Sequence, residues 1–304
     1  MTLKPKQLSL GDVIAIIAPS MAFTKESYQM ASINLSSIGF IVKPSQNLFK
    51  TTYGFAASTK ERASDFNSMV LDDNVKMILF GGGEVSNEIL PYLNFDEIKN
   101  HPKIICSYSD STTILNAITS LTGLVTFYGQ SPRTFFIPTE YNLNSFYSCF
   151  MKNQIPSYYK SGSFRTIHNG VGKGTLIGGY LANFAFMLNS KYLNLNKDTR
   201  YILFIEDYIK FNTPPAISKY ISHIEQSGFF SQVDGLLFGH YSDDAAPLLD
   251  DILKRIGDRY DIPVVRCDDF GHGINNAIIP IGITATLDAD KQSIQFHETL
   301  MENT

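Results

Sequence analysis

Continuous apolar runs that alternate with helical patterns limit the folds open to this chain more than any other feature. Residues 13–18 form one such run, closed by Pro19, and such runs are typical of central parallel strands covered on both faces. The same pattern predicts further strands at 39–42, 75–80, 104–107 and 125–128. Helices are predicted at 25–38 and 59–71, near 86–88 and directly after Ser109. This alternation predicts a right-handed, doubly wound parallel sheet in an α/β protein of the flavodoxin-like type.

The helix predicted over 59–71 is expected to have one apolar and one charged face. Its apolar residues recur at helical spacing and define one buried face: Ala63, Phe66, Met69 and Val70. The charged residues between them are expected to face solvent: Lys60, Glu61, Arg62 and Asp65.

The regular pattern dissolves from about 131 to 169, where Pro and aromatic residues are frequent. We therefore expect an N-terminal α/β domain at 1–135, a connector at 136–170 and a smaller, β-richer α/β domain at 171–304. The connector aromatics are candidates to wall a site, or they pack an ordinary linker. In the C-terminal domain the pattern predicts strands at 174–179, 201–205, 233–238, 264–265, 284–287 and 293–296, and helices at 182–188, 217–228 and 247–256.

Composition excludes several classes of protein. The 304 residues carry a formal net charge of −4 with a pI near 5.9 and no basic block, which argues against nucleic acid as a partner. No run approaches the roughly 18 apolar residues of a membrane span, and the first twelve residues lack the apolar core of a signal peptide. The cysteines Cys106, Cys149 and Cys267 are odd in number and lack CxxC spacing. A cytoplasmic protein without disulfides, metal or other cofactor is therefore expected.

The stretch 103–110 is the strongest candidate for chemistry. It begins as a buried strand, ends in small polar residues and runs at once into a helical pattern. A strand that turns sharply into a helix exposes its corner residue beside unpaired backbone N–H groups. Ser109 at that corner could attack a carbonyl. The alternative is that Ser109 or Asp110 only caps the helix.

Three glycines, residues 81–83, follow the strand predicted at 75–80 and are expected at the same sheet edge as Ser109. They contain neither of the usual phosphate-binding motifs. The glycines could therefore place a backbone N–H so that it donates to a substrate oxygen, or they could form a simple turn.

A serine nucleophile needs a base and an acceptor that orients it. Among six histidines, His272 is the best candidate because glycines flank it, and His240 is a weaker one. Glu206 ends an apolar strand, where an orienting carboxylate would project, although it could also be an edge carboxylate or a cap.

Short motifs in fixed order support this assignment. They are Gly82-Gly83, 86–93, Tyr108-Ser109-Asp110, 123–129, 205–207, 228–230, 235–239, 269–273 and 280–282, preceded by Gly11-Asp12 and 18–20. In this order the chain resembles the LD-carboxypeptidase and microcin C immunity family of serine peptidases, over nearly its whole length.

The resemblance implies a Ser–Glu–His triad of Ser109, Glu206 and His272 and an oxyanion hole made by the backbone N–H groups of Gly83 and Asp110. It implies a cytoplasmic homodimer that hydrolyses an amide. In the carboxypeptidases the bond joins a diamino acid to the terminal D-Ala of a cytosolic murein tetrapeptide. In the immunity branch it joins an aminoacyl or peptidyl group to a modified nucleotide. A non-catalytic peptide- or nucleotide-binding protein is the alternative from another class.

Three positions depart from the family pattern. Ser107 stands where Gly is usual, Gly81 where carboxypeptidase members carry Arg, and Tyr180 where Asn is typical. Gly81 and Tyr180 lack the side chains with which carboxypeptidase members are expected to recognise the carboxylate of D-Ala. Because the chain has no Trp, Tyr or Phe from the connector is expected to stack on a nucleobase if one is bound.

Overall fold

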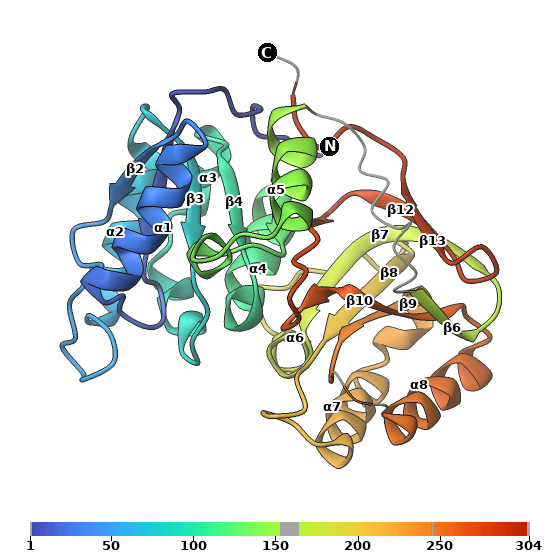
Figure 1. Ribbon diagram of the computed structural model, residues 1–304. Helices are drawn as coiled ribbons and strands as arrows, with labels where there is room; N and C mark the ends of the chain where they lie inside the picture. The colour runs from blue at the N-terminus through green and yellow to red at the C-terminus, as the bar shows by residue number, and fades with distance from the viewer. Residues whose placement is uncertain (1, 153–163, 243, 245, 303–304) are drawn as a thin grey trace.

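The fold is described from a computed structural model, which covers residues 2–152, 164–242, 244 and 246–302. Two sheets lie side by side, the first built mainly from the blue-to-green half of the chain and the second from the yellow-to-red half (Figure 1). The two ends of the described chain meet, since Lys6 forms a parallel bridge with Glu302. The expected combination of a parallel-sheet domain and a β-richer α/β domain is confirmed.

The first sheet has the strand order β11-β5-β4-β3-β1-β2. Five of its strands are parallel and come from the N-terminal half: β1 (Val13–Ile17), β2 (Ile41–Pro44), β3 (Val75–Phe80), β4 (Ile104–Ser107) and β5 (Thr126–Tyr128). Their order is the flavodoxin-like one. The sixth, β11 (Ile279–Ile281), comes from the far end of the chain and pairs antiparallel with β5, so the C-terminal segment is held against the N-terminal sheet.

Helices pack on this sheet, and those predicted at 25–38, at 59–71 and after Ser109 are confirmed. The helix predicted near 86–88 is a 3-10 turn instead, and the sequence did not predict the short helix at 95–100. The helices are α1 (Lys25–Ser37), α2 (Thr59–Leu71), α3 (Phe95–Asn100) and α4 (Thr112–Thr122), with 3-10 turns at η1 (Ser86–Tyr92) and η2 (Ser109–Ser111). Ser58 and Glu61 form a capping box that starts α2. Gly123, with φ 77°, ends α4 in the left-handed conformation that glycine adopts without strain. The predicted strand at 39–42 is shifted to Ile41–Pro44.

The prediction for the outer face of α2 is wrong at two positions. Arg62 is only 1% exposed and Asp65 is also buried. Arg62 donates hydrogen bonds to the carbonyls of Ala57 and Pro19 and pairs with Glu88. A buried guanidinium is tolerated because these groups satisfy its donors.

The connector stretch is more structured than the sequence indicates. It holds the 3-10 turn η3 (Pro132–Phe135), the helix α5 (Glu140–Phe146), a π turn η4 (Tyr147–Met151) and the strand β6 (Phe164–His168). β6 pairs antiparallel with β10 (Val264–Gly271), a strand of the second sheet. Tyr158 and Tyr159 lie outside the described residues.

The second sheet has the order β13-β12-β7-β8-β9-β10-β6. Its remaining strands are β7 (Val171–Tyr180), β8 (Tyr201–Glu206), β9 (Val233–His240), β10 (Val264–Gly271), β12 (Thr284–Asp288) and β13 (Ser293–Phe296). The helices α6 (Leu181–Met187), α7 (Pro214–Gln226) and α8 (Pro247–Tyr260) accompany it, with a 3-10 turn η5 (Phe229–Gln232). The predicted terminal hairpin is confirmed, whereas β10 is far longer than the two residues predicted.

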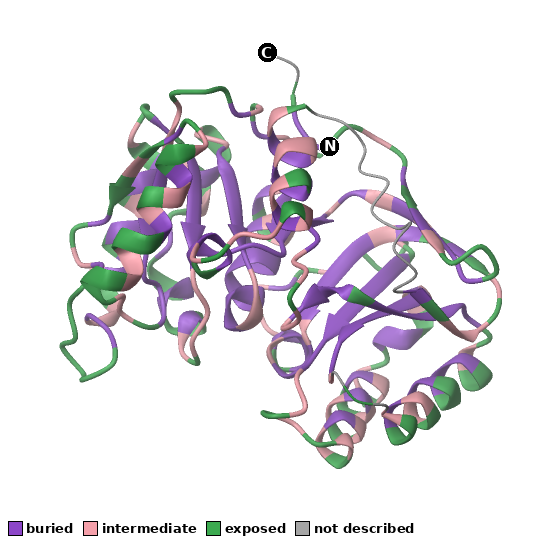
Figure 2. Cartoon of the chain, viewed as in Figure 1, coloured by how far each residue is buried: buried purple, intermediate pink, exposed green. Residues whose placement is uncertain are grey.

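Burial explains how the two halves hold together. The central strands of both sheets are almost wholly buried, whereas the edge strands β2 and β6 are largely exposed or half-buried, and α7 and α8 expose one side (Figure 2). The helix α4 is buried along most of its length because it packs against α6 and β7 as well as its own sheet. Cys106, Cys149 and Cys267 are buried and free of disulfides. Within the described residues, none of the helices has the length and apolar character needed to cross a bilayer.

Candidate active site

Ser109 sits at a strained corner between β4 and α4. Its φ is 61°, one of four non-glycine residues with positive φ in the described chain, and this region is costly for a residue with a Cβ. A hydrogen bond stabilises this strained conformation, because the N–H of Ser109 donates to the hydroxyl of Tyr128 at 2.9 Å. The corner turns the serine out of the sheet at the carboxyl end of a central strand, where parallel sheets place their sites.

The capping alternative for this corner is not observed. The helix α4 has Ser111 at its N-cap position and no side-chain cap, and the 3-10 turn before it has none either. The carboxylate of Asp110 instead accepts hydrogen bonds from the N–H of Ser86 and from Nδ2 of Asn183, both at 2.9 Å. Asp110 therefore ties the corner to η1 and to α6.

Glu206 and His272 lie in direct contact. Nδ1 of His272 is 2.8 Å from Oε2 of Glu206, and the glutamate is fully buried at the end of β8 while the histidine side chain is 12% exposed. Gly271, which ends β10, and Gly239 in β9 make room for this contact, since a Cβ on either would come within 3.0 Å of the Glu206 side chain. A carboxylate at Nδ1 selects the tautomer with its proton there and leaves Nε2 free to accept one.

The surroundings of His272 set its basicity. Burial lowers its pKa, but the charge and hydrogen bond of Glu206 more than offset burial, so that the pKa is raised above 6.5. The charge of Asp207 also raises it, and that of Arg133 lowers it. Asp207 itself has its pKa raised to about 7, chiefly by burial.

Four aromatic rings surround the imidazole. Their centroids lie 5.2 to 5.7 Å from that of His272 and belong to Tyr108, Tyr180, Tyr208 and Phe211. Tyr208 is stacked on the imidazole with an interplanar angle of 5°. Phe211 is 64% exposed, so its ring presents an apolar surface to solvent beside the histidine.

Of the two alternatives for the aromatics of the connector stretch, core packing holds for Phe135, Phe146 and Phe150, which are buried in the core. The loop after β8 supplies Tyr208 and Phe211 to the site instead. The sequence analysis did not identify either residue, although both lie within five residues of Glu206 at the carboxyl end of a strand, which is the signal that could have found them.

Tyr128 is a further residue that the sequence did not single out. It is the last residue of β5, and its buried hydroxyl donates to Oε1 of Glu206 at 2.5 Å while it accepts from the N–H of Ser109. Through this phenol the corner of the first sheet is hydrogen-bonded to the carboxylate of the second. Tyr108, next to Ser109, also touches the His272 ring. Ser109, Glu206 and His272 therefore belong to one group of contacts: Tyr128 bonds to both Ser109 and Glu206, and Glu206 bonds to His272.

The glycine turn after β3 lies against the serine. A Cβ built on Gly82 would come 3.4 Å from Oγ of Ser109, and one on Gly83 would overlap Oγ of Ser20 at 2.2 Å. Gly83 therefore has no room for a side chain, whereas a side chain on Gly82 would only be in tight contact with Ser109. Within the described residues, the N–H of Gly83 donates to no protein acceptor, so it is available to an oxygen from outside the chain.

Two of the unusual residues have structural partners. Ser107 is buried, and its hydroxyl contacts the carbonyl of Phe80 at 2.6 Å and the hydroxyl of Ser111 at 2.8 Å, so it fastens β4 to the end of β3. Tyr180 accepts a hydrogen bond from Nδ2 of Asn212 at 3.0 Å and packs on His272.

The remaining histidines lie outside this group. His101, His168 and His297 are partly or fully exposed and His223 is on α7. His240 is buried close to Gly273, and its Nδ1 lies 3.5 Å from Oδ1 of Asp268. In the part of the chain that the structure describes, no three His, Cys, Asp or Glu side chains are grouped as a metal site would need.

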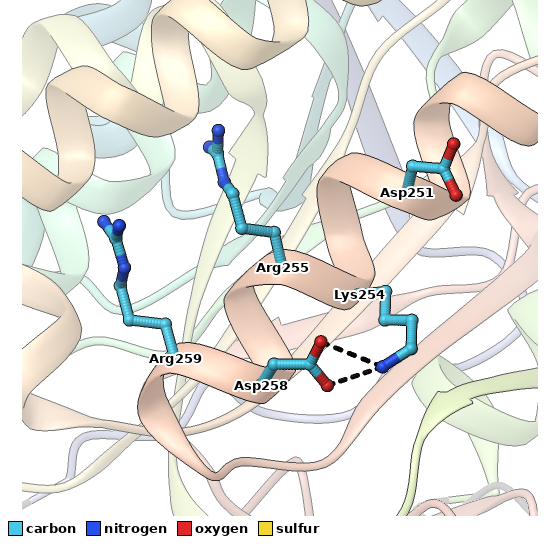
Figure 3. A pocket seen from close by; sticks show the side chains of 5 residues that line it. All are labelled: Asp251, Lys254, Arg255, Asp258 and Arg259. Atoms are coloured by element: carbon cyan, nitrogen blue, oxygen red, sulfur yellow. Dashed lines mark hydrogen bonds and ion pairs between the residues drawn. The ribbon is translucent and has the colours of Figure 1, made fainter.

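A shallow hollow elsewhere on the surface has no part in this constellation. It lies on α8 and is lined by charged side chains (Figure 3): Asp251, Lys254, Arg255, Asp258 and Arg259. Lys254 pairs with Asp258 one turn away, and both arginines pair with Glu225 of α7. Its charges are thus largely compensated within the two helices.

Known proteins match the chain along nearly its whole length. The family model described as the LD-carboxypeptidase N-terminal domain matches residues 14–129, and the one described as the LD-carboxypeptidase C-terminal domain matches residues 173–287. Together they span well over half of the chain, which confirms the resemblance seen in the motifs.

Individual relatives fall in both branches. The microcin C7 self-immunity protein MccF of Escherichia coli is 28% identical, with 96% of this chain and 94% of that protein covered. A probable murein peptide carboxypeptidase of Bacillus subtilis is also 28% identical, with 96% and 93% covered. The crystal structure of an MccF-like protein from Bacillus anthracis superposes with a TM-score of 0.87 at 26% identity, covering 98% of this chain and all of the other.

Proposed function

The chain belongs to the LD-carboxypeptidase family of serine peptidases, and we propose that it hydrolyses an amide with a triad of Ser109, His272 and Glu206. The observation that carries this proposal is the 2.8 Å contact between Nδ1 of His272 and the buried Glu206, next to a serine held at a left-handed corner. A histidine oriented in this way is suited to act as a general base.

The proposed reaction runs in two halves. His272 takes the proton from Ser109 as the hydroxyl attacks the amide carbonyl, and Glu206 stabilises the imidazolium that forms. The backbone N–H groups of Gly83 and Asp110 are proposed to hold the developing oxyanion. His272 then gives its proton to the leaving amine, and a water molecule releases the acyl group from Ser109 by the reverse sequence.

A murein tetrapeptide with a terminal D-Ala is the proposed substrate class. Such a substrate ends in a carboxylate, and Gly81 supplies no side chain to bind it. Arg133 is the candidate partner because it is exposed and its charge acts on both Tyr108 and His272, where it opposes the rise in pKa. No carboxylate of the described residues pairs with Arg133, so its charge is available to a ligand.

One observation favours a second substrate class, an aminoacyl or peptidyl group joined to a modified nucleotide. Phe211 is exposed and packs edge-on against the His272 imidazole, and Tyr208 lies beside it at 5.6 Å between ring centroids. Exposed aromatic rings are suited to stack on a nucleobase. The relative named as a microcin C7 self-immunity protein is consistent with this class.

A parallel assay separates the possibilities. Wild type and Ser109→Ala are incubated with a diaminopimelate- or L-Lys-containing tetrapeptide that ends in D-Ala and with an aminoacyl-sulfamoyl adenosine, and the products are read by mass spectrometry. We expect wild type to release D-Ala and Ser109→Ala to release nothing. Equal turnover by the two proteins contradicts the triad. Binding of either compound without turnover, together with no labelling of Ser109 by a serine-directed probe, identifies a binding protein instead.

We also propose that the protein acts in the cytoplasm as a homodimer. Cytoplasmic murein fragments or modified nucleotides are the substrates that the two branches of the family imply. Analytical ultracentrifugation of the purified chain tests the dimer, and a monomer at micromolar concentration contradicts it.

A further inference from the structure

Tyr128 links the two halves of the candidate active site. It ends β5 of the first sheet, yet its hydroxyl donates to Oε1 of Glu206, which ends β8 of the second sheet. The same oxygen accepts the N–H of Ser109 at 2.9 Å. One buried atom thus contacts both the backbone of the serine and the carboxylate that orients the histidine.

The directions of these hydrogen bonds follow from the groups involved. A phenol has a single proton, and the amide of Ser109 can only donate. The proton of Tyr128 is therefore left for Glu206, and its lone pair takes the amide. Because Oε2 of Glu206 is engaged by His272, both oxygens of the carboxylate have a partner and its plane is fixed.

The ring of Tyr128 has little room to leave this position. It is fully buried and packs on Phe204 with 5.6 Å between ring centroids. Gly179 lies so close that a Cβ there would be 3.0 Å from Cε2 of the tyrosine. The phenol is consequently held by both sheets, and its hydroxyl is aimed by packing as well as by hydrogen bonds.

We propose that Tyr128 is a positioning residue for the hydrolytic reaction, whose hydroxyl fixes the left-handed backbone of Ser109 and the carboxylate of Glu206 in one arrangement. The inference rests on the proposed triad. In this role Tyr128 keeps Ser109, from the first sheet, correctly placed relative to Glu206 and His272, from the second.

A purely structural role and a positioning role predict different pH behaviour. Several groups face the His272 imidazole: the carboxylates of Glu206 and Asp207, the guanidinium of Arg133, and the rings of Tyr108, Tyr180, Tyr208 and Phe211. Without the Tyr128 proton, Glu206 loses a donor, and its charge acts more strongly on His272. The acid limb of the pH profile then moves to higher pH.

The test compares Tyr128→Phe with Tyr201→Phe. Tyr201 is a buried residue that begins β8, the strand that Glu206 ends, and its hydroxyl accepts a hydrogen bond from the N–H of Asn196 at 3.2 Å. It is therefore a matched control at the other end of the same strand. We expect Tyr128→Phe to lower kcat about 10- to 100-fold, equivalent to about 1.4 to 2.7 kcal/mol, with KM within about twofold. We expect the acid limb of kcat/KM to move to higher pH, and Tyr201→Phe to match wild type in all three quantities.

Several results would overturn the inference: an unchanged kcat, a loss carried by KM alone, or an acid limb that does not move. All assays are run below the unfolding transition of the least stable variant, as located by circular dichroism. If neither assayed substrate is cleaved, the rate of Ser109 labelling by a fluorophosphonate replaces kcat. A Glu206→Gln background gives a second measurement, in which Tyr128→Phe should cost clearly less than in wild type; additive losses contradict the inference.

Failure of the inference differs from failure of the proposed function. If Ser109→Ala is inactive while Tyr128→Phe behaves as wild type, the triad stands and the role of Tyr128 is wrong. If Ser109→Ala remains active, the proposed function itself is wrong.

Discussion

The imidazole of His272 lies parallel to the phenol of Tyr208, with an interplanar angle of 5° and 5.7 Å between the ring centroids. Glu206 holds the same imidazole at Nδ1. The stacked ring and the hydrogen bond together define both the plane and the rotation of the histidine. Such preorganisation lowers the cost of reaching a reactive geometry.

The pH dependence of hydrolysis should follow His272. Its pKa is raised above 6.5, and only the neutral imidazole can take the proton of Ser109, so kcat/KM should fall as the pH drops through that raised value. Glu206→Gln removes the charge that raises the pKa. We expect its residual activity to show an acid limb at lower pH than wild type and a kcat reduced by about a thousandfold or more. An acid limb that stays in place would contradict this electrostatic coupling.

Arg133 should distinguish substrates that end in a carboxylate. Arg133→Ala removes the exposed cation near His272, and a lost charge-assisted hydrogen bond should raise KM for the D-Ala tetrapeptide roughly 10- to 100-fold. The same peptide ending in D-alaninamide serves as the control, because it has no carboxylate to lose. An equal change in KM for both peptides would show that Arg133 does not bind the terminus.

Phe211 should matter for a nucleotide substrate. Its exposed ring beside Tyr208 and His272 offers a stacking surface worth roughly 1 to 3 kcal/mol for a base. Phe211→Ala should therefore weaken binding of an aminoacyl-sulfamoyl adenosine, measured by calorimetry on the inactive Ser109→Ala protein. Phe211→Tyr should keep the affinity. If Phe211→Ala binds as tightly as its parent, the base is held elsewhere.

Ser107 should contribute to stability. Its buried hydroxyl contacts the Phe80 carbonyl and Ser111, and Ser107→Ala leaves these groups short of a partner. The free energy of unfolding in urea should fall by about 1 to 3 kcal/mol. Ser37→Ala is the matched control, since the Ser37 hydroxyl bonds a carbonyl at an exposed site, and it should change stability far less. A Ser107→Ala protein as stable as wild type would show that this link is unimportant.

Local pattern predicted much of the fold because strands and helices here depend mostly on neighbouring residues. The bounds of α2 and β3 match the prediction residue for residue. β10 was predicted too short because Arg266, Asp268 and Asp269 interrupt its apolar pattern. Arg266 is buried all the same, since Asp250 pairs with it from α8. A partner so far away in the chain leaves no local signal.

The residues of the candidate site also fall into two groups, those that the sequence identified and those that only the structure revealed. Ser109, Glu206 and His272 stand in short motifs at strand ends, so that sequence alone could nominate them. Tyr128 lies within the motif 123–129, but nothing in that motif links it to Glu206, because their contact depends on how the two sheets meet. Tyr208 lies just outside the motif 205–207, and its contact with His272 depends on how the loops after β8 and β10 meet. Arg62 is similar, because two of the groups that satisfy its buried guanidinium, the Pro19 carbonyl and Glu88, lie on separate elements. Contacts of this kind are set by the tertiary arrangement and not by periodicity.

Labelling with a fluorophosphonate, followed by peptide mapping, tests the nucleophile most directly. The account predicts one adduct, on the peptide that contains Ser109, with labelling that slows in the presence of the cleaved substrate and is absent in Ser109→Ala. An adduct on a different serine, or no adduct from a protein that turns over substrate, would contradict the assignment of Ser109 as the nucleophile.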